Sequence, residues 1–190
     1  MNEKLELRMY GLVPYNISPI QQAIQFGHAV VEYGQKVKRN VHEQDSVLYN
    51  DWADNWKTFI ILNGGTTNHK LEDGLPFGSL NNHLLTLMDN DVDFAQFNEP
   101  DLGDQLTAVV FIVDERVFNR KKYPDFEDWA IENYGDLIRS DQNTTSYMSV
   151  KKIKESTNKS DRKVYEKWLK FIGGEKNAFL RDFLKKFKLA

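Results

Sequence analysis

Four stretches of the chain have the apolar pattern of β-strands. Apolar and polar residues alternate over positions 5–13, and this period of two predicts a strand with one buried face. The run 58–62 is continuous and is typical of a buried strand, and the run 106–113 is the strongest strand signal in the chain. The second run is the longest, so we expect it at the centre of a sheet, with a short edge strand at 94–97.

Helical spacing follows the first strand. Ser18 and Pro19 supply a capping hydroxyl and a first-turn proline, so we expect a helix from Pro19 to about Gln35. One stripe along it is apolar and is expected to pack on the sheet, with its glycine permitting close approach: Ile20, Ala23, Ile24, Gly27 and Val31. A second stripe is polar: Gln21, Gln25, His28 and Glu32.

Further helices are expected between and after the remaining strands. Helical spacing predicts a short amphipathic helix within residues 36–57 and another at about 80–88. Three more follow residue 114: an aromatic-rich helix around Trp129, then two others, the last with a Phe and Leu face opposite basic residues that include Arg181. The order strand, helix, strand, helix, strand, strand predicts an α/β fold with a mixed sheet.

Charge is divided unevenly along the chain. We expect residues 1–115 to form the α/β domain and residues 116–190 a helical, basic C-terminal extension. Residues 151–190 hold 13 Lys and Arg against 5 Asp and Glu, so this segment carries +8 and the remainder −11 of the total of −3. This asymmetry favours a basic face for a polyanion or a tail that docks on its own acidic body. A solvated, Lys-rich helical surface is the alternative.

Composition narrows the classes of site. The chain of 190 residues has no Cys, which excludes a disulfide framework, a thiolate zinc site and a cysteine nucleophile. Its 4 His are too far apart for a helical metal motif, so we expect neither a metal nor a cofactor. The sequence has no apolar run of bilayer length and no signal-peptide pattern at its start, so we expect a cytoplasmic protein that does not bind membranes.

Two polar groups of residues are candidates for acid–base chemistry. His28, on the polar stripe, is a candidate acid or base, because histidine is the side chain suited to proton transfer near neutral pH; the alternative is a half-exposed helix face. Glu99 and Asp101 flank a proline in the loop before the longest strand, where α/β sheets often place their sites. Either carboxylate could orient His28 or hold a water, and a solubilising turn is the alternative.

A third group, Gly64, Gly65 and Thr66, follows the second strand. Glycines at such a position can let backbone N–H groups approach an anion. The segment lacks the lysine of a P-loop and the glycine spacing of a dinucleotide fingerprint, so we do not expect nucleoside triphosphate hydrolysis.

The segment Gln25-Phe26-Gly27-His28-Ala29 resembles the Gln-x-x-His-Ala segment on the first helix of type 2 peptidyl-tRNA hydrolases. The order of elements is similar too, and residues 99–108 lie where that family has an Asp- and Thr-containing loop before its last strand. Short phrases at 18–22, 64–66 and 99–102 resemble a divergent branch of such proteins that is associated with bacteriophage genomes. The resemblance covers about residues 5–113.

This resemblance implies a three-layer α/β/α sandwich with a small mixed four-stranded sheet, plus C-terminal helices. It also implies hydrolysis of the ester between peptide and tRNA. Glu99 or Asp101 with His28 would activate water, Gln25 would orient the carbonyl, and the basic tail would contact tRNA phosphates. The expected ligand-binding residues are Gln21, Gln22, Gly64, Gly65, Thr66 and Thr107.

The chain departs from the family at one functional position. Type 2 peptidyl-tRNA hydrolases carry a lysine about one turn before the glutamine, whereas this chain has Gln21 and Gln22 there and no lysine in residues 17–35. Glutamine supplies no cation to a phosphate or an oxyanion. Either Lys57 or a residue of the tail replaces the lysine, or hydrolysis has been lost.

Two hypotheses from other functional classes follow. One is a catalytically inactive relative that binds RNA or a nucleotide-like ligand, serving a phage in host takeover or against host defence, in the cytoplasm of the infected cell. The other is a protein–protein module in which the aromatic helices around Trp129 and at the C-terminal end form a homodimer or capture a host partner.

Overall fold

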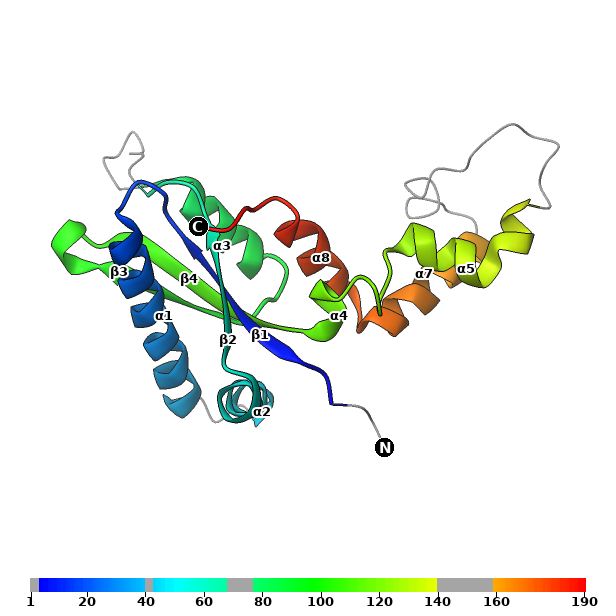
Figure 1. The fold of residues 1–190 in the computed structure, drawn as a ribbon, viewed down its shortest axis with the longest axis horizontal. Coiled ribbons are helices and arrows are strands. Elements are labelled where there is room, and N and C mark those ends of the chain that lie inside the picture. Colours follow the sequence, from blue (N-terminus) through cyan, green and yellow to red (C-terminus); the bar gives the residue numbers. More distant parts are fainter. Residues whose placement is uncertain (1–3, 40–42, 68–76, 140–158) are drawn as a thin grey trace. The chain divides into compact units, whose positions relative to one another are not determined.

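The computed structural model describes residues 4–39, 43–67, 77–139 and 159–190 (Figure 1). Contacts divide the chain into two compact units: unit 1 is Met1–Glu115 with Asp182–Ala190, and unit 2 is Arg116–Arg181. The expected extension 116–190 is therefore not one body. Its last segment returns to unit 1, where Phe183 packs on Phe111 of the sheet.

Unit 1 is built on a four-stranded mixed sheet with the strand order β2-β1-β4-β3. The strands are β1 (Leu7–Val13), β2 (Thr58–Asn63), β3 (Phe94–Glu99) and β4 (Gln105–Asp114). β1 runs parallel to β2 and antiparallel to β4, and β3 pairs antiparallel with β4 (Figure 1). The four strands expected from the apolar pattern are confirmed, and the longest lies inside the sheet. β2 is not the buried strand that its apolar run predicts, because it lies at the edge of the sheet, and its Phe59 is 48% exposed.

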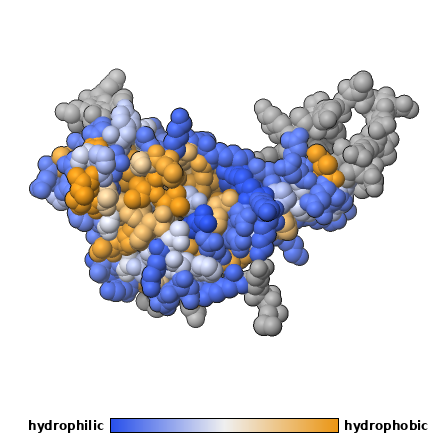
Figure 2. Space-filling model, in the orientation of Figure 1, coloured by the Kyte–Doolittle hydropathy of each residue, from blue (hydrophilic) through white to orange (hydrophobic). Residues whose placement is uncertain are grey.

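Helix α1 (Pro19–Arg39) packs over β3 and β4, but not through the stripe that the sequence indicates. Ile20, Ile24 and Val31 are 69%, 47% and 61% exposed, and a Cβ on Gly27 would meet nothing within 4 Å. The predicted packing face is therefore wrong. Figure 2 shows apolar residues gathered at the surface over this part of unit 1.

The buried face of α1 is instead Gln25, Phe26, Ala29 and Tyr33. The large rings of Phe26 and Tyr33 fill the space between α1 and the sheet, and the expected apolar stripe lies on the other side of the helix. Because Gln25 and Tyr33 are buried, their polar atoms need hydrogen-bond partners. The Tyr33 hydroxyl donates to Asp93, and so does the Lys36 ammonium, which also donates to the Phe94 carbonyl oxygen at 2.8 Å.

The remaining elements of unit 1 complete both sides of the sheet. α2 (Glu43–Asp51) continues into a π-helical turn, η1 (Trp52–Trp56), and Trp52 joins the core beneath α1. α3 (Ser79–Met88) contacts β4. α4 (Glu115–Phe118) follows β4 directly in the sequence, and only its first residue belongs to unit 1. The C-terminal residues pair with the outer edge of β2. Asn63 N–H donates to the Lys188 carbonyl oxygen at 2.9 Å, and Ala190 N–H donates to the Ile61 carbonyl oxygen at 3.1 Å.

His83 of α3 lies against two aromatic rings of the returning C-terminal segment. Its ring is edge-on to Phe187 at a centroid distance of 4.8 Å and to Phe183 at 6.0 Å. Burial lowers the pKa of His83, and the positive charge of Lys186 lowers it further. The imidazole is thereby favoured in its neutral form in the folded protein.

Unit 2 contains α5 (Phe126–Arg139), α7 (Lys159–Ile172) and most of α8 (Glu175–Leu184). Its core consists of buried aromatic and aliphatic side chains: Phe126, Trp129, Ala130, Trp168, Ile172 and Ala178. Trp129 is therefore packed within its own unit. The polar break expected at 140–149 lies outside the described residues.

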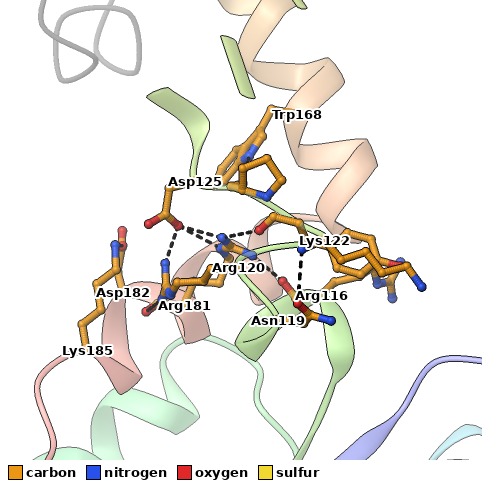
Figure 3. Close-up of polar contacts among 11 residues, drawn as sticks. Arg116, Asn119, Arg120, Lys122, Asp125, Trp168, Arg181, Asp182 and Lys185 are labelled. Carbon is orange, nitrogen blue, oxygen red and sulfur yellow. Dashed lines mark hydrogen bonds and ion pairs between the residues drawn. The ribbon is translucent and has the colours of Figure 1, made fainter. Parts of the chain in front are cut away.

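Arg181 corrects a second prediction, because it does not belong to the basic, solvated face of α8. Its side chain is 1% exposed. Within unit 2 the guanidinium donates to Asp125 Oδ1 at 2.7 and 3.2 Å, to the Tyr123 carbonyl oxygen at 2.7 Å, and to that of Arg116 (Figure 3). A buried cation is tolerated here because these acceptors satisfy it.

None of the helices in the described part of the chain is both long and apolar enough to span a membrane.

Candidate functional site

The predicted site residues meet at one end of the sheet. The register aligns Leu12 of β1 with Leu62 of β2 and Val109 of β4. The ends of β1 and β2 therefore lie beside the start of β4. α1 begins from this same end, after the short turn that follows β1, as does the loop that follows β2 (Figure 1).

A chain of side-chain hydrogen bonds joins α1, β3 and β4 there. The hydroxyl of Thr107, whose residue is fully buried, donates to Gln25 Oε1 at 2.7 Å. Because the amide oxygen accepts this bond, the orientation of the Gln25 amide is fixed with Nε2 on the other side. Nε2 donates to Glu99 Oε2 at 2.6 Å. Three residues far apart in the sequence are thus held in one line.

Local structure explains how Glu99 reaches this position. Pro100 opens a 3-10 turn, η2 (Pro100–Leu102), which Glu99 caps, with Oε1 accepting a long bond from Asp101 N–H at 3.4 Å. Gly103 then takes a positive φ of 68°, and Asp104 N–H donates back to the Glu99 carbonyl oxygen at 3.1 Å. The turn closes on itself, so the Glu99 carboxylate stays at the end of β3.

Asp101 has no comparable role. Its residue is exposed, and within the described residues its backbone N–H bonds to Glu99 while its carboxylate has no partner. Of the two carboxylates that the sequence offers, the structure brings only Glu99 to Gln25.

His28 lies one helical turn beyond Gln25 on α1. Its ring packs on that of Phe97 with a centroid distance of 4.4 Å, at an angle of 59°. Phe97 stands two residues before Glu99 on β3, so the pairs Gln25–Glu99 and His28–Phe97 are successive contacts between the same helix and strand. The His28 residue is exposed, and neither ring nitrogen has a hydrogen-bond partner among the residues that the structure describes.

Gln21 and Gln22 both bond to the turn that precedes α1. Gln21 Oε1 accepts from the Ser18 N–H at 3.0 Å and from the Ser18 hydroxyl at 2.9 Å, a capping box. Gln22 Nε2 donates to the Ile17 carbonyl oxygen at 3.1 Å. Neither amide replaces a lysine, and both are occupied by the backbone of the preceding turn.

Lys57 does not supply the missing cation. It precedes β2, whose first residue, Thr58, aligns with Arg8, whereas the site lies at the other end of the sheet beyond Leu62. Glu99 forms no ion pair with a lysine or arginine in the described ranges. The site thus has an acid and an imidazole without an adjacent cation.

The glycine loop is used internally. Gly64 N–H donates to the Val13 carbonyl oxygen at 2.7 Å and Gly65 N–H to Asn63 Oδ1 at 2.9 Å. Thr66 N–H donates to the Ser79 hydroxyl at 2.8 Å. All three N–H groups that were expected to approach an anion are therefore directed to the chain itself.

Two contacts at the site were not predicted from the sequence. Thr67, 2% exposed, donates from its hydroxyl to Gln105 Oε1 at 2.9 Å and so ties the loop after β2 to the start of β4. Phe97 supports the imidazole of His28. The only sequence signal for Phe97 is its place in an expected edge strand, which does not indicate which helix residue lies above it.

The arrangement can perform acid–base chemistry. It places a solvent-accessible imidazole one helical turn from Gln25, the amide that fixes the position of the Glu99 carboxylate. No group of three or more His, Cys, Asp or Glu placed to hold a metal ion occurs among the described residues. Comparison of the chain with protein-family models and with curated proteins finds no match.

Proposed function

We propose that unit 1 is a peptidyl-tRNA hydrolase type 2-like domain that hydrolyses the ester between a peptide and the terminal ribose of tRNA. The observation that carries the proposal is the line Thr107–Gln25–Glu99 with His28 one turn away. It joins the segment that resembles the family's Gln-x-x-His-Ala to the loop that resembles its Asp- and Thr-containing loop. The same resemblance carries the three-layer sandwich architecture and the cytoplasmic location, in an infected host cell if the protein is encoded by a phage.

In this proposal His28 is the general base. It takes a proton from water as the water oxygen adds to the ester carbonyl carbon, and it returns the proton to the ribose oxygen when the ester C–O bond breaks. Gln25 Nε2 has a second N–H besides the one donated to Glu99, and this N–H orients the ester carbonyl. Glu99 holds the Gln25 amide in place.

One observation favours a second candidate, a relative that binds RNA or a nucleotide-like ligand without turnover. The positions that carry the family's lysine are taken by helix-capping glutamines, and Lys57 lies at the opposite end of the sheet. An oxyanion or phosphate at the site then lacks a neighbouring cation. This candidate keeps the line Thr107–Gln25–Glu99 and the exposed His28 as its binding site and drops the reaction.

The two candidates are separated by hydrolysis of an N-acetylated aminoacyl-tRNA at fixed salt. We expect His28→Ala to lower kcat by about 10²–10⁴-fold, the range for loss of a general base. Glu99→Gln is expected to lower it less. Asp101→Asn is the matched control, because Asp101 is exposed and makes no side-chain contact in the described residues.

Turnover that is equal in all four proteins and no faster than the spontaneous rate would refute the hydrolase and leave the binding candidate. A loss confined to Asp101→Asn would move the catalytic carboxylate to the turn and contradict the assignment of Glu99.

A further inference from the structure

A stripe of lysines runs along the exposed face of α7 in unit 2. Lys163, Lys167 and Lys170 are spaced by four and three residues, so they lie on one side of the helix over about 10 Å. All three are exposed, and none has an ion-pair partner within the ranges that the structure describes. We call these three residues the lysine stripe.

Aromatic rings flank this stripe. Phe171, next to Lys170, is 38% exposed, and its ring lies 5.4 Å from that of Tyr123 and stacks on Trp129 at 6.1 Å. Lys167 donates to the Tyr134 hydroxyl at 3.0 Å and stands over that ring at 5.3 Å. Lys122 stands over the Tyr123 ring at 5.7 Å. Cations and aromatic rings thus lie close to one another in this part of unit 2.

The loop that presents Lys122 and Tyr123 is held firmly. The Arg181 guanidinium donates to the Tyr123 carbonyl oxygen at 2.7 Å and to Asp125, which also accepts from Arg120 (Figure 3). Within the loop, Lys122 N–H donates to Asn119 Oδ1 at 3.2 Å. A surface supported by a buried guanidinium loses little conformational freedom on binding, which favours affinity.

Cations outnumber acids among the exposed residues of α7 whose burial is described. The exposed acids of α5 are on the other helix of the pair: Glu127, Asp128 and Glu132. On α7, the exposed charged residues whose burial is described are Arg162, the lysine stripe and Glu166, and Glu166 lies on the side of the stripe, three residues after Lys163 and four before Lys170. Four cations against one acid leave this part of α7 with a net positive charge, which favours an anionic partner.

We infer that this face of unit 2 binds single-stranded RNA. The lysine stripe contacts the phosphates, and the exposed Phe171 ring stacks on a base. Rows of cations beside exposed aromatic rings are how proteins hold single strands, whereas duplexes keep their bases stacked on one another and offer no free face to a ring. The inference rests on the proposed function only for the choice of RNA over single-stranded DNA.

The test uses the full chain and a fluorescein-labelled 12-nucleotide oligouridylate, with binding followed by anisotropy over a series of salt concentrations. Replacing the lysine stripe by glutamine removes three phosphate contacts and is expected to lower the slope of log K against log salt by about 2. The matched control replaces three exposed lysines elsewhere and changes the net charge equally: Lys57→Gln, Lys176→Gln and Lys188→Gln. We expect this control to keep the slope.

Phe171→Leu tests stacking separately, because it keeps an apolar side chain of similar size and removes the ring. We expect a loss of affinity of about five- to a hundredfold, the range for one stacked base. A 12-base-pair RNA duplex should bind the wild type more weakly and should not distinguish Phe171→Leu from it. Circular dichroism and thermal unfolding establish that each variant is folded.

Three results would overturn the inference: equal loss of affinity in the stripe variant and its lysine control, unchanged affinity in Phe171→Leu, or a duplex that binds as well as the single strand. The oligouridylate carries no ester, so the proposed hydrolysis is judged independently. A wild type that binds it through the stripe but hydrolyses no aminoacyl ester would refute the hydrolase and leave this surface established.

Discussion

Substitution of Thr107 by Val tests whether the candidate site is held by the hydrogen-bonded line that joins α1 to β4. Val has nearly the shape of Thr, so the change removes the hydroxyl that donates to Gln25 Oε1 at 2.7 Å without leaving a cavity. The hydrogen bond contributes about 0.5–1.5 kcal/mol, and an amide oxygen left buried without a donor costs about 1–3 kcal/mol. We therefore expect a loss of about 1–3 kcal/mol in the free energy of unfolding of unit 1.

Thr86→Val is the matched control, because the Thr86 hydroxyl donates to the Asn82 carbonyl oxygen on the exposed side of α3. Its effect should stay within about 0.5 kcal/mol. Hydrogen exchange of the β4 amides reports the opening of unit 1 alone, which matters because a chain of two units need not unfold in one step.

A double-mutant cycle identifies the partner. If Thr107 acts through Gln25, then Gln25→Leu and Thr107→Val together should cost about 0.5–1.5 kcal/mol less than the sum of the single changes. Strict additivity, or a Thr107→Val effect no larger than that of Thr86→Val, would refute the role of this contact in positioning the site.

Three further predictions concern packing, the buried arginine and pH. Phe26→Ala should destabilise unit 1 by about 3–5 kcal/mol and Ile24→Ala by less than about 1 kcal/mol in urea unfolding, since only Phe26 is buried; equal effects would contradict the packing face of α1. Asp125→Ala should destabilise unit 2 by about 1.5–3 kcal/mol in α7 hydrogen exchange, because Arg181 loses its charged acceptor, and an unchanged exchange rate would speak against this. The pKa of His83 is lowered in the folded protein, so the unfolded chain binds more protons, and the free energy of unfolding should fall as pH drops below about 6.5. His83→Phe should remove this part of the pH dependence. A His83→Phe variant with the same pH profile as the wild type would be the contrary result.

The strands were predictable from sequence because their signal is local. The run 106–113 is buried on both faces, and all of its residues except Thr107 are apolar, so no tertiary information is needed to recognise β4. Ser18 and Pro19 likewise mark the start of α1, and the capping box with Gln21 bears this out.

The buried face of α1 was not predictable in the same way. Both sides of the helix carry apolar residues, and the side that is buried also contains Gln25 and Tyr33, which any hydropathy pattern assigns to solvent. Their partners, Thr107 and Asp93, lie far along the chain, so the compensation that permits burial is invisible in the helix sequence. Arg181 on α8 was misassigned for the same reason.

Which residues form the candidate site was easier to predict than how they are arranged. The resemblance singles out Gln25, His28, Glu99 and Thr107, and the structure brings Gln25, Glu99 and Thr107 into one line of hydrogen bonds. The choice of Glu99 over Asp101 depends on the 3-10 turn that Glu99 caps, which is a property of the folded loop.

Chemical rescue of His28→Ala measures the central claim most directly. The His28 residue is exposed, so removing its ring leaves a site that free imidazole can enter from solvent. We expect cleavage of N-acetylated aminoacyl-tRNA by His28→Ala to rise with imidazole concentration, and we expect no response from the wild type or from Asp101→Asn. A wild type without turnover, or a His28→Ala variant that hydrolyses the ester at the wild-type rate without imidazole, would contradict a general base at His28.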